Sequence, residues 1–419
     1  MTISSIRHNI NKRGVIGCVL FYLSRLHTQI CIQLMRLVIR IHSEPQETIV
    51  FRSSNLDFSD NAKALFDYLI SHNYQEKYKI VWCVYDPQKY INYQSNKVRF
   101  VTTEGKNGWV SLRAVYYGAT ARFFFFTHDT AGINQVRCQG QTAINIGHGN
   151  GYKAPKKNIE KILNKSYKFD YLLVSGPAFI DVKAQYWNCE KEKILDIGFP
   201  RYDWFHKKTD KVSILRQLFG IELNSDKVIL WLPTFFNNHE IDFPENKLKL
   251  PLGFSGIQNR QELEQLDQCC KSYNVQLIIK QHPNQIDWIK NGISYSNIYF
   301  LNNEQLTLMD ISLPELMSVT DALMTDFSSA AVDYLLLDRP IGFVLTDFER
   351  YAQTRGFIID NPKDYMPGEH LYFLQDFIQF IKNISKDIDL YAEKRNVMRS
   401  IMHNETECYC ERIINHFQI

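Results

Sequence analysis

Residues 320–329 read Thr320-Asp321-Ala322-Leu323-Met324-Thr325-Asp326-Phe327-Ser328-Ser329, and an apolar run then carries the chain to Asp333-Tyr334. Residues 322–324 are short and apolar, which predicts a buried strand. Residues of the type that cap helices follow, so a helix is expected to begin at the two serines. This segment therefore predicts a strand-to-helix junction of the kind that α/β proteins contain.

A helix that begins at two serines collects several groups that attract anions. Its first backbone N–H groups have no partner inside the helix, and its dipole is positive at this end. The hydroxyls of Thr325, Ser328 and Ser329 lie nearby in the sequence. Such junctions hold phosphates at the carboxyl edge of α/β sheets. An ordinary capped helix stays open as the simpler interpretation, because serine caps occur in all kinds of helix.

Two histidines follow predicted strands elsewhere in the chain. His148 stands between two glycines after the apolar residues 144–146, and His282 precedes Pro283 after the strand-like residues 277–279. Glycine beside His148 lets a ligand approach the backbone closely, and proline ends the second strand. Each histidine alone is also explained by a structural role. Together with the helix start, they indicate a site with a diphosphate and a proton acceptor, as in phosphoryl or glycosyl transfer.

Strand and helix patterns alternate along the chain after residue 48. We expect strands at 49–51, 78–84, 121–126, 143–146, 171–174, 228–232, 275–279, 298–301, 322–324 and 341–345. We expect helices at 61–70, 108–117, 263–273, 313–319 and 328–337, with closing helices in 373–384 and 391–417. This alternation indicates parallel sheets covered by helices, and 419 residues are too many for one ordinary core. Two domains follow, at 48–210 and 211–419, after a separate segment 1–47.

These motifs occur in an order that resembles the CDP-glycerol glycerophosphotransferase family, whose enzymes prime or polymerise teichoic-acid-type glycerol or ribitol phosphate polymers. The resemblance covers most of the chain after about residue 48. The segments that carry it are Phe51-Arg52-Ser53-Ser54, Ser59-Asp60-Asn61, Gly147-His148-Gly149 with Lys153, Gly198-Phe199-Pro200-Arg201-Tyr202-Asp203, Leu232-Pro233-Thr234-Phe235, Lys280-Gln281-His282-Pro283, Thr320-Asp321, Thr325 to Ser329, Asp333-Tyr334, Arg339-Pro340-Ile341 and Arg355-Gly356-Phe357.

The resemblance implies a fold, a reaction and roles for particular residues. The fold is a GT-B-like pair of Rossmann-type domains with a cleft between them. The reaction moves glycerol phosphate, or a related alditol phosphate, from CDP-glycerol or CDP-ribitol to a hydroxyl of a lipid-linked or polysaccharide acceptor and releases CMP. His148 is the expected general base, and His282 the expected stabiliser of charge on the leaving group. The expected donor-binding residues are Lys280, Thr325, Asp326, Ser328, Ser329, Asp333 and Arg355.

This chain departs from the family pattern at four motifs. Thr320 and Phe327 stand where the family usually has Ser and Tyr, and the other two departures are larger. The family usually has Thr-Pro after its His-Gly pair, where Asn150-Gly151 stands here, and Phe236 stands where a basic residue is frequent. Two other functions therefore stay open. One is a GT-B glycosyltransferase that uses a nucleotide sugar, and the other is a membrane-associated binding or assembly subunit with a decayed site.

Composition excludes several other classes of protein. The formal net charge is +3, and no basic tract lies outside the N-terminus, which argues against nucleic-acid binding. The nine cysteines form no pair of Cys-x-x-Cys units, so neither zinc nor a disulfide framework is expected. No Gly-x-Gly-x-x-Gly motif occurs, so no dinucleotide cofactor is expected. We expect a cytosolic enzyme that uses no cofactor.

The first 43 residues form a separate basic and apolar segment. They contain no Asp or Glu, and Arg7, Lys12, Arg13, Arg25, Arg36 and Arg40 alternate with apolar residues. The longest apolar run, 15–23, is shorter than the roughly 20 residues that cross a bilayer. The sequence therefore predicts an amphipathic helix that lies on the anionic cytoplasmic face of the plasma membrane as a peripheral anchor. A helix packed on the protein's own core is the alternative.

Overall fold

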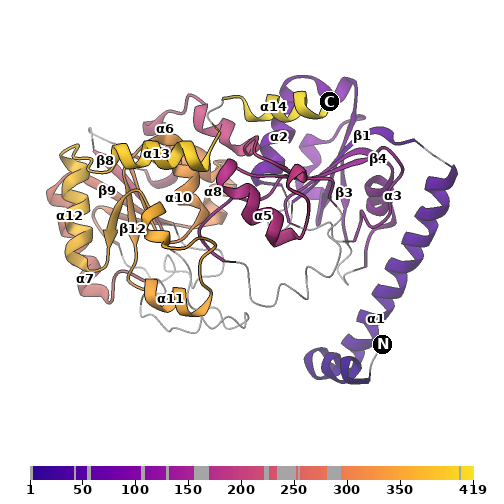
Figure 1. Ribbon diagram of the computed structural model, residues 1–419, viewed down its shortest axis with the longest axis horizontal. Coiled ribbons are helices and arrows are strands. Elements are labelled where there is room, and N and C mark those ends of the chain that lie inside the picture. Colours follow the sequence, from indigo (N-terminus) through magenta and orange to yellow (C-terminus); the bar gives the residue numbers. More distant parts are fainter. Residues whose placement is uncertain are drawn as a thin grey trace. The chain divides into compact units, whose positions relative to one another are not determined.

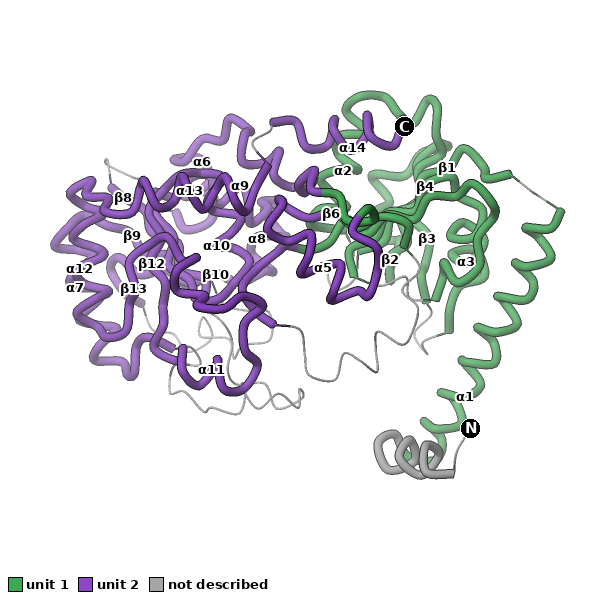
Figure 2. Tube along the Cα trace, viewed as in Figure 1, with its two compact units in different colours: residues 1–148, 166–173, 192–195 green, residues 149–165, 174–191, 196–419 purple. Residues whose placement is uncertain are grey.

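Two parallel sheets organise the chain (Figure 1). The computed structural model describes residues 3–41, 44–53, 58–104, 109–128, 132–154, 169–220, 226–233, 252, 255–280, 294–404 and 407–419. Contacts divide the chain into two compact units (Figure 2). Unit 1 contains residues 1–148, 166–173 and 192–195, and unit 2 contains 149–165, 174–191 and 196–419. The domain bounds at 48–210 and 211–419 stay predictions, because this division describes contacts and not independent folding.

Within the described residues, unit 1 has a seven-stranded sheet of order β3-β2-β1-β4-β5-β6-β7, in which neighbouring strands are parallel. Its apolar strand residues are almost all buried, as expected where helices cover both faces of a parallel sheet. The strands are β1 (Gln46–Arg52), β2 (Lys79–Val84), β3 (Val98–Thr102), β4 (Ala121–Phe126), β5 (Thr142–Asn145), β6 (Tyr171–Leu173) and β7 (Ile194–Leu195). Helices α2 (Asp60–Ser71) and α3 (Leu112–Thr120) connect β1 to β2 and β3 to β4.

Unit 2 has a six-stranded parallel sheet among its described residues, of order β10-β9-β8-β11-β12-β13. Its strands are β8 (Lys227–Leu232), β9 (Val275–Lys280), β10 (Ile298–Leu301), β11 (Ala322–Thr325), β12 (Ile341–Val344) and β13 (Glu369–Leu371). On one side, buried strand residues such as Trp231 and Met324 pack with Phe377 and Phe380 to form an apolar core.

The helices of unit 2 are mostly short, and those before β13 lie between strands, whereas the last three follow it. They are α5 (Ile180–Trp187), α6 (Lys211–Phe219), α7 (Arg260–Ser272), α8 (Asn303–Leu308), α9 (Leu313–Ser318), α10 (Ser329–Tyr334), α11 (Phe348–Thr354), α12 (Leu374–Ser385), α13 (Ala392–Met402) and α14 (Tyr409–Phe417). Phe377 and Phe380 belong to α12.

Each sheet has one point at which the strand order reverses. In unit 1 the chain runs outward through β1, β2 and β3, and β4 then enters on the other side of β1. In unit 2 the chain runs outward through β8, β9 and β10, and β11 then enters on the other side of β8. Open α/β sheets bind ligands at the carboxyl ends of the strands beside such a reversal. The residues that follow β1 and β4, and those that follow β8 and β11, are therefore the expected ligand-binding positions.

The N-terminal helix α1 (Ile3–Ile41) has two different faces over its described side chains. Gly14 has a φ of +72°, so the helix is kinked there. Beyond it, Cys18, Cys31 and Met35 are buried, and α1 packs against α3. The opposite side is a stripe of exposed apolar residues at intervals of three or four, namely Ile16, Leu20, Leu23, Leu26, Ile30, Leu34, Leu37 and Ile41.

The expected N-terminal helix is present, but the argument that it is too short to cross a bilayer is wrong. The helix runs past Ser24-Arg25 without a break, and Gly14–Ile41 has 28 residues. In the described part of the chain this is the one helix that is long and apolar enough to cross a membrane, and an 18-residue window within it has a mean hydropathy of 1.5. Only 17% of that window is buried. Length and composition alone therefore do not exclude a spanning helix.

Candidate active site

The switch point of unit 2 contains the predicted strand-to-helix junction. β11 ends at Thr325, whose buried hydroxyl donates to the carbonyl of Leu232 across the reversal (2.9 Å). Ser328 is the N-cap of α10, and its Oγ accepts the N–H of Ala330 (3.3 Å). Ser329 is the first residue of α10 and is half-buried. The junction is thus confirmed, while diphosphate binding by these three hydroxyls stays a prediction.

A glycine-rich segment, residues 149–154, lies directly on this helix start and is called the glycine loop below. Gly149 has a φ of +125°, and a Cβ there would lie 3.0 Å from Ser329 Oγ and 2.9 Å from Arg201 Nη2. A Cβ on Gly151 would lie 3.0 Å from both the backbone N and Cα of Ser329. Because side chains at these positions would strike the first turn of α10, both glycines are required for the close approach.

The predicted Arg355-Gly356-Phe357 motif fixes the other end of the glycine loop. The N–H of Ala154 donates to Gly356 O, and the N–H of Ile358 donates to Tyr152 O, both at 3.0 Å. Arg355 Nε donates to Ala154 O (2.9 Å). Two motifs about 200 residues apart in the sequence are therefore paired as extended backbone. Donor binding by Arg355 stays a prediction, and its Nε already has a backbone partner.

Charged groups converge beside the glycine loop at the carboxyl edge of unit 2. Asp326 is only 3% exposed, and Lys153 Nζ lies 4.0 Å from its Oδ1. Asp347, after β12, is a second carboxylate that sequence reasoning missed. Burial raises the pKa of Asp347, the charge of Asp326 raises it further, and Arg350 opposes both. The positive charge of Lys153, a residue of the glycine loop, thus offsets the negative charge of Asp326.

A buried ion pair joins α10 to the segment that contains Arg201. Arg201 Nη2 lies 2.6 Å from Asp333 Oδ2, and the Tyr202 hydroxyl donates to Asp333 Oδ1 (2.8 Å). Burial, together with the charge of Asp333, holds the pKa of Tyr202 well above its usual range. Both oxygens of Asp333 thus bind residues of the 3-10 helix Pro200–His206. This arrangement indicates that Asp333 positions Arg201 beside Gly149, and its predicted contact with the donor stays a prediction.

In unit 1, His148 follows β5 and is held by neighbouring elements. Its ring stacks on that of His128, which follows β4, with centroids 4.0 Å apart and planes inclined by 19°. Asn61, fully buried at the start of α2, donates from Nδ2 to the carbonyls of Ile146 and Gly147 (3.0 and 3.1 Å). The turn that carries His148 is therefore tied to the switch point of unit 1.

The remaining predicted residues lie at the end of β9. Lys280 is the last residue of that strand, and burial lowers its pKa to about 8. His282 lies outside the described residues, as do Pro283, Thr234 and Phe236. A lysine whose charge is destabilised by burial gains most from an anionic ligand, so the position agrees with the donor role predicted for Lys280.

Sequence reasoning missed His128, Asn61 and Arg201 as site residues. His128 obeys the rule that singled out His148, because it follows the apolar strand 121–126. Asn61 and Arg201 belong to segments that carried the family resemblance, yet no role was assigned to them. Among the described residues, no group of three or more His, Cys, Asp or Glu side chains is placed to hold a metal ion.

Other motifs of the resemblance lie at the amino edge of the unit 2 sheet, away from this site. Asp321 Oδ2 accepts the N–H of Val228 (2.7 Å) and pairs with Lys211 Nζ (2.6 Å). Arg339 Nη1 donates to the carbonyl of Ser318 (2.8 Å) and to that of Thr320. Thr320-Asp321 and Arg339 therefore join strands and helices of this unit.

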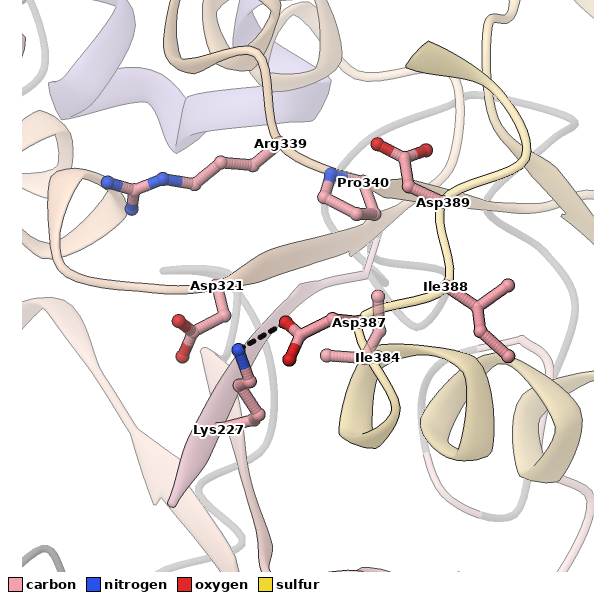
Figure 3. A pocket seen from close by; sticks show the side chains of 8 residues that line it. All are labelled: Lys227, Asp321, Arg339, Pro340, Ile384, Asp387, Ile388 and Asp389. Carbon is pink, nitrogen blue, oxygen red and sulfur yellow. Dashed lines mark hydrogen bonds and ion pairs between the residues drawn. The ribbon is translucent and has the colours of Figure 1, made fainter. Parts of the chain in front are cut away.

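A cavity of about 240 Å³ lies at the same amino edge (Figure 3). Lys227 pairs with Asp387 across it, while Asp389 pairs with Arg395. The lining residues are Lys227, Asp321, Arg339, Pro340, Ile384, Asp387, Ile388 and Asp389. Its carboxylates thus have cationic partners within unit 2.

Two Rossmann-type units, with a serine-capped helix at one switch point and a strand-end histidine near the other, form an arrangement that suits a nucleotide-dependent group transferase. A family model described as CDP-Glycerol:Poly(glycerophosphate) glycerophosphotransferase matches residues 34–413. The chain therefore belongs to that family.

Individual relatives agree with this assignment. The teichoic acid poly(glycerol phosphate) polymerase of Bacillus spizizenii is 24% identical over 82% of this chain and 85% of its own length. The teichoic acid glycerol-phosphate transferase of Staphylococcus aureus is 25% identical over 84% of this chain and 88% of its own. A solved structure of the wall teichoic acid polymerase TagF aligns with a TM-score of 0.72 at 19% identity, covering 100% of this chain and 98% of that one. The structural likeness confirms the predicted GT-B-like fold.

Proposed function

We propose that this enzyme transfers an alditol phosphate from a CDP-alditol to a hydroxyl of a cell-surface polymer precursor. Family membership supports the reaction class. Relatives include a glycerol-phosphate transferase and a ribitol-phosphate primase, and a variant of TagF has been soaked with CDPG. The observation that carries the proposal is the glycine loop: it begins directly after His148 and lies on the helix start at Ser329.

In this mechanism the acceptor hydroxyl attacks the β-phosphorus of the donor. A new oxygen–phosphorus bond forms, the bond from the β-phosphorus to the bridging oxygen breaks, and CMP leaves with the electron pair. His148 takes the proton of the attacking hydroxyl, a contribution of roughly 10²- to 10⁴-fold. His282 and Lys280 stabilise the charge of the departing CMP.

Backbone and hydroxyl groups of unit 2 hold the donor diphosphate in this proposal. The first N–H groups of α10 and the Ser328 and Ser329 hydroxyls supply hydrogen bonds, and Lys153 and Arg201 supply positive charge. The peptide bond between His148 and Gly149 keeps the base within one residue of the loop that lies on Ser329. Asp333 and Tyr202 position Arg201, and Asn61 positions the turn of His148.

We further propose that α1 docks the enzyme as a peripheral protein on the cytoplasmic face of the plasma membrane, where a lipid-linked acceptor is presented. The exposed apolar stripe supports insertion, and Arg25, Arg36 and Arg40 are exposed toward anionic head groups. A spanning arrangement would remove Cys31 and Met35 from their buried positions on the side of α1 that packs on the rest of unit 1, where α1 contacts α3. An interfacial helix keeps those contacts and still covers the stripe.

Product analysis tests the reaction. The purified protein is incubated with a membrane acceptor and CDP-glycerol, CDP-ribitol or a UDP-sugar, and free nucleotide and labelled polymer are quantified. We expect CMP and incorporated alditol phosphate in equal amounts from one of the CDP-alditols. Release of a nucleoside diphosphate with transfer of sugar would instead identify a glycosyltransferase. Binding of a CDP-alditol without any CMP would identify a binding subunit.

A further inference from the structure

His128 follows β4 at the switch point of unit 1 and lies beside the proposed base. Thr127, between β4 and His128, is buried, and its N–H donates to the carbonyl of Arg52 at the end of β1 (3.2 Å). The neighbouring strand β5 is bound to β4 in a similar way, since the N–H of Ile146 donates to the carbonyl of Phe126 (2.8 Å). The backbone before the base and the backbone before His128 therefore have a fixed register.

The rings of His128 and His148 lie face to face. Their centroids are 4.0 Å apart, and their planes are inclined by 19°. His148 is exposed and His128 is half-buried, so this contact does not serve to fill a hydrophobic core. The hydroxyl of Thr127 forms a hydrogen bond with Nδ1 of His128 (3.1 Å), while Asn61 binds the turn before His148. Neighbouring groups thus hold both members of the stack.

The stacked geometry excludes two other roles for His128. The nitrogen atoms of an imidazole donate and accept hydrogen bonds in the plane of the ring, so a ring that covers the face of His148 cannot take a proton directly from it. A metal ion shared by the two rings would need nitrogen lone pairs that converge on one point, whereas the lone pairs of stacked rings lie in nearly parallel planes. His128 is therefore neither the next acceptor in a proton relay nor a metal ligand together with His148.

The stack becomes important when the base acquires a charge. His148 becomes a cation when it takes up the proton of the attacking hydroxyl. A neutral aromatic ring stabilises a cation that lies over its face, whereas two cations at this separation repel each other. His128 therefore supports the base only while it is itself neutral. Neighbouring elements add Arg52 at the end of β1, Asp60 at the start of α2 and Arg201 beside the glycine loop, and all the variants below retain these three charges.

We propose that His128 is a positioning residue for the general base. Its neutral ring holds the ring of His148 with the nitrogen-bearing edge toward the acceptor hydroxyl, and it stabilises the imidazolium that forms. The proton moves to His148, and the electron pair of the O–H bond forms the new oxygen–phosphorus bond, so His128 gains no proton in this step. The inference rests on the proposed function, because it assigns a role beside the base of that reaction.

Two substitutions separate the ring of His128 from its nitrogen atoms. His128→Phe keeps an aromatic face, and His128→Gln keeps polar atoms without a ring. We expect His128→Gln to lower kcat for CMP release by about 3- to 30-fold with an unchanged KM for the CDP-alditol. His128→Phe should stay within about threefold of the wild type. The acid limb of the pH dependence of kcat should move to lower pH in His128→Gln, because the imidazolium of His148 is less stable without the stack.

His72 provides a matched control. It is exposed at the end of α2, and its ring stacks on that of Tyr68 with centroids 4.0 Å apart and planes inclined by 22°. This stack has almost the same geometry but lies outside the proposed site. His72→Gln should therefore leave kcat and its pH dependence unchanged. Urea unfolding midpoints of the variants check that the differences in kcat do not come from loss of the fold.

Histidine titration followed by NMR tests the stack without requiring turnover. The ring signals of His128 and His148 are assigned by their loss in His128→Phe and in His148→Ala. In the wild type we expect each of these two signals to respond to two protonation steps, because the charge of one ring acts on the other. In His128→Phe the signal of His148 should show one step. The signal of His72 should show one step in every protein.

The outcomes separate the role of His128 from the reaction. Unchanged kcat in His128→Gln, or an equal loss in His128→Gln and His128→Phe, would overturn the positioning role. One-step titration of His148 in the wild type, together with normal CMP release, would overturn the stack and leave the proposed reaction standing. Absence of CMP release from every CDP-alditol, together with two-step titration, would overturn the proposed reaction and with it the role of His128 in catalysis, while the two rings would still be coupled.

Discussion

His148 is exposed at the end of a turn whose backbone is held by Asn61, so its side chain can be removed without disturbing a core. We predict that His148→Ala lowers kcat for CMP release by at least about 100-fold, because a general base contributes roughly that much. The unfolding midpoint should stay unchanged. His72→Ala, which removes an exposed histidine just after α2, should keep full activity. More than about a tenth of wild-type turnover in His148→Ala would contradict the assignment.

His403 lies outside the active site, and it lowers the stability of the fold at acid pH. It is buried, its Nε2 donates to the carbonyl of Val332 in α10 (2.7 Å), and burial lowers its pKa to about 4 from 6.5. As the pH falls below 6.5, His403 therefore binds a proton in the unfolded chain, whereas it stays neutral in the folded protein. The stabilisation is complete above that pH and is lost progressively toward pH 4.

We predict that this one group removes about 3 kcal/mol of stability between pH 6.5 and 4. Urea unfolding of wild type and His403→Asn over this range measures it. The variant is expected to be less stable at pH 7 but to have a shallower pH dependence. Parallel curves for the two proteins would show that His403 does not carry the effect.

Among the elements, strands that are mostly apolar over four or more residues could be predicted from the sequence, whereas β3, β7 and β13 could not. The predicted strands 121–126 and 298–301 match β4 and β10 in full. β3, β7 and β13 were missed, because Arg99 interrupts the first, the second has only two residues, and the third reads Glu-His-Leu. These strands are stabilised by pairing with neighbours, which leaves no local pattern.

The closing helices, too, could be predicted only in part from the local sequence. Residues 391–417 were predicted as closing helix without a stated break, but the structure has two helices, α13 and α14, and the described residues 403–404 and 407–408 between them are not helical. α14 restarts because both carboxylate oxygens of Asp203 accept N–H groups of Tyr409 and Cys410 (2.7 and 2.9 Å). That cap comes from a residue about 200 positions earlier. The ion pair of Arg201 with Asp333 likewise joins distant segments, so sequence spacing alone could not reveal it.

The start of α10 supports a prediction about the donor. Ser328→Ala with Ser329→Ala should weaken CDP-alditol binding by about 10-fold, because hydrogen bonds to charged groups contribute about 1.5–3 kcal/mol. Calorimetric titration with CDP-glycerol and CDP-ribitol measures this. Ser312→Ala is the matched control, since Ser312 caps α9 through its Oγ in the same way. It should cost about 1 kcal/mol of stability without changing donor affinity. Unchanged affinity in the double variant would leave Ser328 and Ser329 as simple caps.

At the scale of the whole molecule, membrane attachment and chemistry are assigned to different parts of the chain. We predict that removal of residues 1–43 abolishes co-sedimentation with anionic vesicles and spares CMP release with a short water-soluble acceptor. Full-length protein with Arg25, Arg36 and Arg40 changed to Gln should bind more weakly, by about 1 kcal/mol per charge. Its residual binding should be less sensitive to salt than that of the wild type, because the apolar stripe remains while only Arg7, Lys12 and Arg13 still supply positive charge. Equal sedimentation of the full-length and truncated proteins would contradict membrane docking and would mean that α1 has a purely structural role.

The motifs that make this family recognisable serve two separable purposes. Thr320-Asp321 and Arg339 join strands and helices at the amino edge of unit 2, while His148 and the helix start at Ser329 lie at carboxyl edges. Selection for folding and selection for catalysis therefore act on different positions of one pattern. A descendant could lose the base and keep the scaffold motifs, and a search by overall pattern would still recover it. The presence or absence of His148, the glycine loop and Ser328-Ser329 would show whether such a descendant is an enzyme.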